Sequence, residues 1–436
     1  MFDHAARPRC PACAVTAMVL ACAGAGAANA QSTSNAIFVA NNGNLEGSVT
    51  AFRVNADGAL VFVNKVVTGV RAQTSDPCAG CNAYDISITP DGKHLATCHP
   101  AGDLDGVTIL RINADASVAQ TVQVPLPMGV GAPLDCVWLD NEYLAVDRQD
   151  TSPDQIVVYR YDPQVPALNF INAFPTTTNS LAYFAMHPTL PVLYTNDSAQ
   201  KVVRAWSWSP PGTLTLIDTE SSGAPFPLEL AVNRAGTQLY AAGGISNGGH
   251  SVVVFDMADD GTLTLLPNSP YVSLGNSPSN VYCSDDDQFL IIGHGTDATA
   301  RLMRIGPYSG TMTAFFFDVG TQGTLGDVHS RGNFVFVTDN STLDGQMGIY
   351  SFTLGGDGSL TMNGGSIFST QGIAPRSVAS WFPATPLYAD VNGSGMVDIH
   401  DLMLVVTAWG ASGGGGGNPA DVNGDNTVNI LDLLAV

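Results

Sequence analysis

Two stretches of twelve residues carry oxygen-bearing side chains at matching positions: residues 390–401 (DVNGSGMVDIHD) and residues 421–432 (DVNGDNTVNILD). A calcium loop of this length takes ligands from positions 1, 3, 5, 7, 9 and 12, with a sharp turn at position 6. Gly395 and Asn426 hold that turn position, and both residue types tolerate a left-handed backbone. The spacing therefore predicts two calcium sites. Their expected ligands are Asp390, Asn392, Ser394, Met396, Asp398 and Asp401 in the first loop, and Asp421, Asn423, Asp425, Thr427, Asn429 and Asp432 in the second.

The surroundings of these loops differ from those of an EF-hand. Position 12 is Asp instead of Glu, and the stretch before the first loop, WFPATPLYA, does not have the pattern of an amphipathic helix. Together with the near-copy of the loop and the helical stretch DLMLVVTAWG, these features make residues 385–436 resemble a type I dockerin. The resemblance implies a small α module of the F-hand type, folded by calcium, and a cohesin-like or other extracellular scaffold protein as partner. We expect the second repeat to be truncated.

The first 30 residues have the pattern of an export signal. Arg7 and Arg9 precede an apolar stretch too short to span a bilayer, and Ala28-Asn29-Ala30 has the small-x-small form of a cleavage site. This pattern predicts a secreted protein, extracellular or periplasmic, with lipid attachment at Cys22 as the alternative. No later stretch has the length and hydrophobicity of a transmembrane helix.

Charge and cysteine content limit the partners and the covalent links. The formal net charge is −22, which excludes nucleic acid and an anionic membrane surface, since both need a basic footprint. Five cysteines follow the leader, so at least one thiol is unpaired within the chain. In an oxidising compartment we expect a disulfide within the set Cys78, Cys81 and Cys98, and we favour this over a zinc site because no fourth ligand is evident.

The rest of the chain is a repeat that is clearest at its turns. The segments DGAL (57–60), PGTL (211–214), DGTL (260–263), SGTM (309–312) and DGSL (357–360) each separate two runs of alternating apolar and polar residues, which is typical of β-hairpins. The units that contain them recur about every 47 to 50 residues, with four short strands each, as in propeller blades. They begin near Tyr84, Leu134, Leu181, Leu228, Pro278 and Leu325.

An incomplete pair of segments completes the count. The N-terminal runs AIFVANNG, GSVTAFRVNADG and ALVFVNKVV supply three strands, and RSVASWFP (376–383) supplies a fourth. Joining them makes a seventh blade and leaves no exposed sheet edge between the chain ends. We therefore predict an all-β fold over residues 31–384, a seven-bladed β-propeller closed by its N- and C-terminal strands.

Turns such as TPDGKHL and units such as GSVTAFRVNADGALVFV resemble the lactonase family of seven-bladed propellers, which includes 6-phosphogluconolactonases. Members of that family commonly carry Pro-Arg-His or Pro-His at the start of an inner strand. The matching segments here are 83–85 (Ala-Tyr-Asp), 181–183 (Leu-Ala-Tyr) and 375–377 (Pro-Arg-Ser). The histidine is missing from all three, and only Arg376 keeps the family residue, so hydrolysis by the family mechanism is not the first expectation.

Acidic residues lie at or near the starts of the inner strands: Asp85, Asp135, Glu229 and Asp327, with Asn280 at a comparable place. A ring of this kind suits a cation or the hydroxyls of a sugar, because both take oxygen ligands. The alternative, which we favour, is that these residues cap strand ends and face channel water.

Loops between the second and third strands should open at the same end of the channel. A histidine there, His99 or His294, could act as a general base beside a carboxylate, and with Arg376 these are the catalytic candidates. We favour a solvated rim without catalysis. The polar residues of the rim are His99, Asp147, Arg148, Asp197, His294 and Asp339.

These patterns favour a secreted binding module, in which a lactonase-like propeller presents a ligand site for a small sugar or lactone and a calcium-dependent dockerin attaches it to a scaffold. The alternative is an extracellular hydrolase of a lactone or of carbohydrate-derived material in polysaccharide catabolism. The two hypotheses differ in whether the residues at the channel mouth form a catalytic set.

Overall fold

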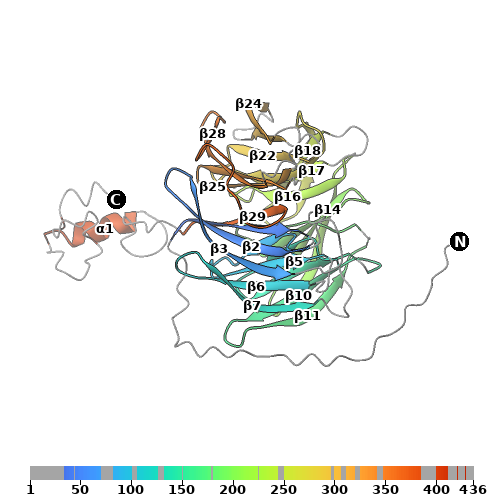
Figure 1. Ribbon diagram of the computed structural model, residues 1–436. Helices are drawn as coiled ribbons and strands as arrows, with labels where there is room; N and C mark the ends of the chain where they lie inside the picture. The colour runs from blue at the N-terminus through green and yellow to red at the C-terminus, as the bar shows by residue number, and fades with distance from the viewer. Residues whose placement is uncertain are drawn as a thin grey trace.

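The strands of the computed structural model form seven antiparallel sheets arranged around a central channel (Figure 1). The structure describes residues 34–43, 45–69, 82–100, 106–125, 132–149, 151–177, 180–223, 225–243, 250–295, 299–305, 311–319, 325–340, 347–383 and 399–410, together with residues 420 and 428. The predicted signal segment therefore lies outside the described residues.

Each sheet is one blade, numbered here in chain order from the first complete unit. Blade 1 consists of β4 (Ile86–Ile88), β5 (His94–His99), β6 (Gly106–Ile112) and β7 (Val118–Pro125). Blade 2 consists of β8 (Cys136–Trp138), β9 (Tyr143–Arg148), β10 (Gln155–Asp162) and β11 (Ala167–Pro175). Blade 3 consists of β12 (Phe184–Met186), β13 (Val192–Asp197), β14 (Val202–Ser209) and β15 (Thr213–Ser221).

The next three blades repeat this order from the channel outward. Blade 4 consists of β16 (Pro227–Val232), β17 (Gln238–Gly243), β18 (Ser251–Met257), β19 (Leu263–Leu265) and β20 (Tyr271–Val272). Blade 5 consists of β21 (Pro278–Cys283), β22 (Phe289–His294), β23 (Thr299–Arg304) and β24 (Thr311–Asp318). Blade 6 consists of β25 (Leu325–Arg331), β26 (Phe334–Asp339), β27 (Gly348–Leu354) and β28 (Leu360–Met362).

Blade 7 joins the two ends of the propeller. Its inner strand is β29 (Pro375–Trp381), which pairs with β1 (Ala36–Asn42), followed by β2 (Gly47–Val54) and β3 (Leu60–Gly69). Val378 lies opposite Val39, and Ala379 lies opposite Phe38. Figure 1 shows the orange β29 beside the blue N-terminal strands. The predicted seven-bladed propeller, closed by its terminal strands, is confirmed.

The recurring turns that the structure describes in full behave as their sequences predict; the turn at 309–312 lies partly outside the described residues. Gly58 and Gly212 have positive φ values of 77° and 104°, which glycine adopts without the penalty of a Cβ. Each turn packs on the second strand of the preceding blade: a Cβ on Gly58 would meet the Phe334 ring at 2.7 Å, and one on Gly212 would meet Tyr143 at 3.4 Å. Glycine thus serves both the turn and the contact between blades.

The core lies between blades, where alternate residues of the second strands face opposite neighbours. On β1, Ile37 and Val39 pack with blade 6 around Phe336, whereas Phe38 and Ala40 pack with blade 1. All of these second strands are buried along their full length. The inner strands are therefore held by apolar contacts on both sides and line the channel.

The C-terminal part contains one described helix, α1 (Ile399–Thr407), which begins within the last three residues of the first predicted calcium loop and continues into the stretch predicted to be helical. Val405 is buried with Ala420 and Val428. The predicted calcium ligands lie outside the described residues, except that Asp401 falls within α1, where its side chain is not described. No described helix has the length and apolarity needed to cross a membrane.

Candidate functional site

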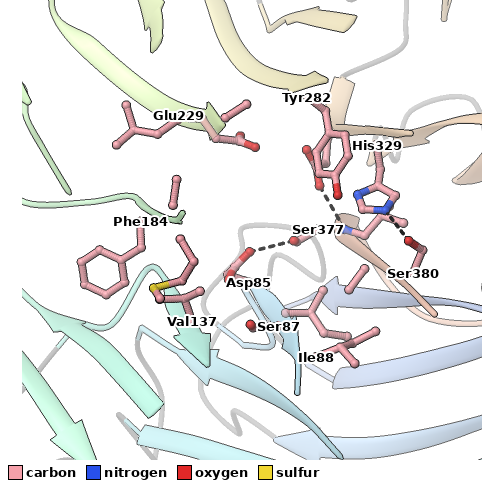
Figure 2. A pocket seen from close by; sticks show the side chains of 18 of the residues that line it. Asp85, Ser87, Ile88, Val137, Phe184, Glu229, Tyr282, His329, Ser377 and Ser380 are labelled. Atoms are coloured by element: carbon pink, nitrogen blue, oxygen red, sulfur yellow. Dashed lines mark hydrogen bonds between the residues drawn. The ribbon is translucent and has the colours of Figure 1, made fainter. Parts of the chain in front are cut away.

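The innermost strands of all seven blades surround a central cavity of about 740 Å³. Figure 2 shows side chains from different blades pointing into it. One layer of residues holds an equivalent position in all seven blades. In every blade, the next residue along the chain lies on the inner strand and pairs with the fourth residue of the second strand. We call this layer the ring, and all of its members are polar. They are Asp85, Asp135, Tyr183, Glu229, Asn280, Asp327 and Ser377.

Three ring carboxylates connect one blade to the next. Asp85 Oδ2 accepts a hydrogen bond from the backbone N–H of Cys136 at 3.4 Å, and Asp135 Oδ2 accepts one from Phe184 at 2.6 Å. Asp327 Oδ2 accepts from the N–H of Val378 at 3.0 Å. The donors belong to the inner strand of the following blade, whose channel edge would otherwise lack partners. These contacts tie neighbouring inner strands together, so the three carboxyl groups have a structural role.

Further hydrogen bonds run around the ring itself. Ser377 Oγ donates to Asp85 Oδ1 at 2.8 Å, which Figure 2 shows as a dashed line. The side-chain amide of Asn280 donates to Glu229 Oε2 at 2.5 Å and lies 3.4 Å from Asp327 Oδ1. One neutral amide therefore bridges two carboxyl groups from blades 4 and 6.

The ring carboxyls hold protons more strongly than ordinary carboxyls. Burial raises the pKa of Asp327 to about 7. Burial also raises the pKa of Asp85, and it raises those of Asp135 and Glu229 well above the usual range, with repulsion from a neighbouring carboxylate adding to the last two shifts. Asp85 and Glu229 are only half-buried, so channel water screens part of their repulsion. The ring carboxyls therefore keep their protons to a higher pH than exposed carboxyls do.

Arg376 supplies a positive charge beside this acidic layer. Its guanidinium carbon lies 3.9 Å from the centroid of the Tyr84 ring, a stacking distance for a cation on an aromatic face. Burial raises the pKa of both Glu229 and Asp327, and the charge of Arg376 offsets part of that rise. The side chain is half-buried at the channel, so a ligand there would meet a cation, aromatic rings and carboxyl groups together.

The opposite end of the inner strands has different chemistry. Arg234 and Arg331 both approach Asp285 Oδ1, with Nη1–Oδ1 distances of 3.3 and 3.5 Å. All three residues line the same cavity. The two ends of the channel therefore differ in charge, and the carboxyl-rich end is the one that carries Arg376.

Within the described part of the chain, no group of three or more His, Cys, Asp or Glu side chains is placed to hold a metal ion. The described ring therefore gives no support to the cation hypothesis. The hydroxyl groups of a polyol remain as the ligand chemistry suggested by the sequence.

The rim residues are not solvated as predicted, because the second strands extend through them. His99 ends β5, His294 ends β22, and Asp147 and Asp197 lie in β9 and β13. Asp147 Oδ1 accepts from the backbone N–H groups of Leu134 and Asp135 at 2.7 and 2.8 Å. All of the predicted rim residues are buried: His99, Asp147, Arg148, Asp197, His294 and Asp339.

The two histidine candidates hold structural hydrogen bonds away from the described channel wall. The N–H of Ala83 donates to His99 Nδ1 at 3.1 Å, so Nε2 carries the hydrogen and donates to Thr108 Oγ1 at 2.9 Å. Burial lowers the pKa of His99 to about 3. His294 Nε2 lies 3.0 Å from Ser273 Oγ. Neither imidazole lines the cavity, so the structure gives neither the position of a general base.

Replacing His99 with alanine should lower the free energy of unfolding by about 1–3 kcal/mol, because the buried N–H of Ala83 loses its acceptor. Ligand binding in the channel should not change. Chemical denaturation beside a binding measurement on the same variant checks both statements. A loss of binding without a loss of stability would return His99 to the functional site.

Sequence reasoning did not single out Tyr282 and His329, nor the residues Arg234, Asp285 and Arg331 at the other end of the channel. The rings of Tyr282 and His329 lie 4.1 Å apart between centroids, and His329 Nε2 lies 2.8 Å from Ser380 Oγ. Figure 2 shows both side chains at the cavity. They lie two residues after Asn280 and Asp327, and side chains at i and i+2 of a strand share a face. This two-residue period could have identified Tyr282 and His329 as channel residues from the sequence.

The disulfide predicted within Cys78, Cys81 and Cys98 does not include Cys98. This residue is a fully buried free thiol in β5, and its apolar contacts include Cys136 of the next blade. Cys78 and Cys81 lie outside the described residues, so a link between those two remains a prediction.

The fold and the site together define a seven-bladed propeller with a polar channel. The family model for "Lactonase, 7-bladed beta-propeller" matches residues 27–325, and the chain belongs to this family. Residues 388–436 match the "Dockerin type I domain" model.

Solved structures agree with this fold. The periplasmic gluconolactonase PpgL of Pseudomonas aeruginosa is similar with a TM-score of 0.60 at 16% identity, covering 80% of this chain and 99% of that one. A provisionally described 6-phosphogluconolactonase from Bacteroides uniformis has a TM-score of 0.61 at 13% identity, with 80% and 100% coverage. A similar one from Bacteroides fragilis has 0.62 at 14%, with 80% and 98% coverage. A search of curated proteins found no match.

Proposed function

We propose that this protein is a secreted binding module whose channel takes a small sugar or lactone and whose dockerin attaches it to an extracellular scaffold. The observation that carries the first part is Arg376, stacked on Tyr84 beside Glu229 and Asp327. Carboxyl and guanidinium groups converging at an aromatic wall suit a ring that presents several hydroxyls and a carbonyl oxygen. The cavity of about 740 Å³ is large enough for one such ligand.

Hydrolysis of the same ligand class is the second candidate. Asp327 has a pKa of about 7 and that of Glu229 is raised well above its usual range, and carboxyls of this kind serve as general bases near neutral pH. Asp327 uses both oxygens to accept from the backbone N–H groups of Val328 and Val378. Glu229 is therefore the better candidate for activating water, with Arg376 stabilising the developing oxyanion.

One experiment separates the two. Unphosphorylated aldonolactones and the matching neutral sugars are titrated into the chain by calorimetry, and acid release is followed in a pH-stat. We expect binding without turnover above the spontaneous rate, and at least a tenfold loss of affinity in Arg376→Gln, whereas Arg331→Gln at the other end has little effect. Turnover that disappears in Glu229→Gln would establish the hydrolase, and no binding of any compound would overturn both.

We infer that the attachment depends on calcium. Type I dockerins bind calcium and bind the cohesins of scaffold proteins, and residues 388–436 match that domain. The ligands are those predicted above from the two loops. Calcium would fold the module and so prepare it for docking.

Titration of the calcium-free chain should therefore show two bound calcium ions. Asp390→Ala should remove the first and Asp421→Ala the second, because each deletes the first ligand of its loop. Chelation should also remove the helical signal of α1. Retention of that signal in excess chelator would contradict the calcium requirement.

A further inference from the structure

We propose that the cleft between blades 4 and 5 is a second ligand site, which takes a single pyranose residue of a glycan. This cleft is separate from the channel and has a volume of about 370 Å³, within the usual range of small-molecule sites. The residues that carry the argument are Gln238, Tyr240, Asp256, Leu266, Tyr271 and Met303.

The cleft has a polar end built from three side chains. The hydroxyl of Tyr240 donates to Gln238 Oε1 at 2.6 Å, and Gln238 Nε2 donates to Asp256 Oδ1 at 3.1 Å. Gln238 is 7% exposed, so its amide is fixed from both sides, whereas Asp256 is exposed to solvent. A carboxylate and an amide held side by side offer acceptors and donors to adjacent sugar hydroxyls.

The opposite wall is apolar because the outer strand of blade 4 is interrupted. β19 ends at Leu265 and β20 begins at Tyr271. Between them, the N–H of Leu266 donates to Val254 O at 3.0 Å. The half-buried ring of Tyr271 and the side chain of Met303 line the gap. An aromatic face next to polar groups is an amphipathic surface, which matches the apolar C–H face and the hydroxyl edge of a pyranose.

The interface between blades 6 and 7 has the same interruption but is filled. The outer strand of blade 6, β28, ends at Met362, and Phe368 then forms a bridge to Ile349. In blade 4, Tyr271 pairs with Val252 in the same way. In blade 6, the first and third residues of the second strand are Phe334 and Phe336. The same positions in blade 4 are Gln238 and Tyr240. Phe52 of blade 7 and Met303 of blade 5 hold equivalent positions, because each pairs with the second residue of the second strand of its own blade.

This internal comparison argues that the cleft is a built feature. At the interface between blades 6 and 7, Phe334, Phe336 and Phe52 hold the matching places, and Phe62 and Phe368 pack against them. At the other interface, two hydrogen-bonding side chains and a slender methionine hold the same places. Buried polar groups at a blade interface need hydrogen-bond partners, and here Tyr240, Gln238 and Asp256 supply them to one another. The exposed carboxylate of Asp256 at the end of this chain is left open to the hydroxyl groups of a ligand.

The test is saturation-transfer NMR on the full chain, with and without Arg376→Gln, which weakens the proposed channel site at least tenfold. The probes are the methyl glycosides of glucose, galactose, mannose and xylose, with phenethylamine as an aromatic cation. We expect transfer to at least one glycoside, strongest on one ring face. Met303→Phe should weaken that binding at least tenfold while keeping or raising the melting temperature, because it rebuilds the packing of the filled interface.

A matched pair of variants completes the design. Asp256→Asn should weaken glycoside binding, whereas Thr353→Ala should not, since Thr353 pairs with Phe334 as Asp256 pairs with Gln238. The proposal is overturned if no glycoside shows transfer, if transfer survives Met303→Phe, or if phenethylamine binds better than every glycoside. Transfer that falls on Arg376→Gln belongs to the channel, whereas transfer that falls on Met303→Phe or Asp256→Asn belongs to the cleft.

Discussion

Replacing Phe38 with alanine should lower the free energy of unfolding by about 3–5 kcal/mol, the usual cost of emptying a buried aromatic site. Phe38 is fully buried in β1, opposite Ala379 of β29 on one side and Ala51 of β2 on the other. It packs against Leu95 of blade 1. Its side chain therefore supports the pairing of strands that are more than 300 residues apart, and it also holds blade 7 against blade 1.

Denaturation of the variant and the parent chain, followed by circular dichroism in the β region, measures this cost. Phe170→Ala is the matched control, because Phe170 lies on the outer strand β11 with 50% of its surface exposed, and it should change stability by about 0.5 kcal/mol or less. If both variants lost the same small amount, closure of the ring by β1 and β29 would not be an important source of stability.

The propeller was predictable because its signals are local and repeated. Turns such as those at Gly58 and Gly212 identify hairpins wherever they occur, and the number of hairpins determines the number of blades. The pairing of β1 with β29 followed from the fold, since three N-terminal strands and one C-terminal strand make a complete blade. In both cases the inference needed only the period of the pattern.

The environment of the rim was not predictable in this way. His99 was assigned to an exposed loop, but β5 continues through it and its ring accepts from Ala83, which belongs to the connection before β4. Asp147 similarly accepts from residues at the start of its own inner strand. A polar residue at a strand end looks the same in sequence whether it meets water or a buried N–H group. Only the packing of neighbouring segments separates the two.

The ring was partly predictable for the same reason. The positions of Asp85, Asp135, Glu229 and Asp327 followed from their place before apolar inner strands. Their protonation did not, because it depends on contacts between residues about 50 positions apart, each in a different blade. Asp85 and Asp135 lie close enough for each to shift the pKa of the other, and burial raises the pKa of both. This contact leads to a prediction about pH.

The ring should make the propeller less stable as the pH rises. Its carboxyls have folded-state pKa values above those of the unfolded chain, so the folded state binds more protons between the two values. The stability they contribute is fully present below the unfolded value of about 4. It is lost as the pH rises through the folded values, with Asp327 at about 7 as the reference. Ionising Asp135 in the folded state is opposed by its burial and by Asp85.

Asp135→Asn should therefore stabilise the protein by about 1–3 kcal/mol at pH 8 and change it by less than about 0.5 kcal/mol at pH 4.5. The amide reproduces the protonated acid, because its oxygen can accept from the N–H of Phe184 while its NH₂ donates to Asp85.

Asp327→Asn is the contrasting variant, because both oxygens of Asp327 accept from backbone N–H groups. An amide at this position leaves one backbone N–H facing the side-chain NH₂, so the variant should be less stable at both pH values. Urea denaturation of the three proteins at the two pH values measures these differences. Equal destabilisation by Asp135→Asn at both would mean that Asp135 is ionised in the folded protein and that its hydrogen bond to Asp85 does not hold a proton.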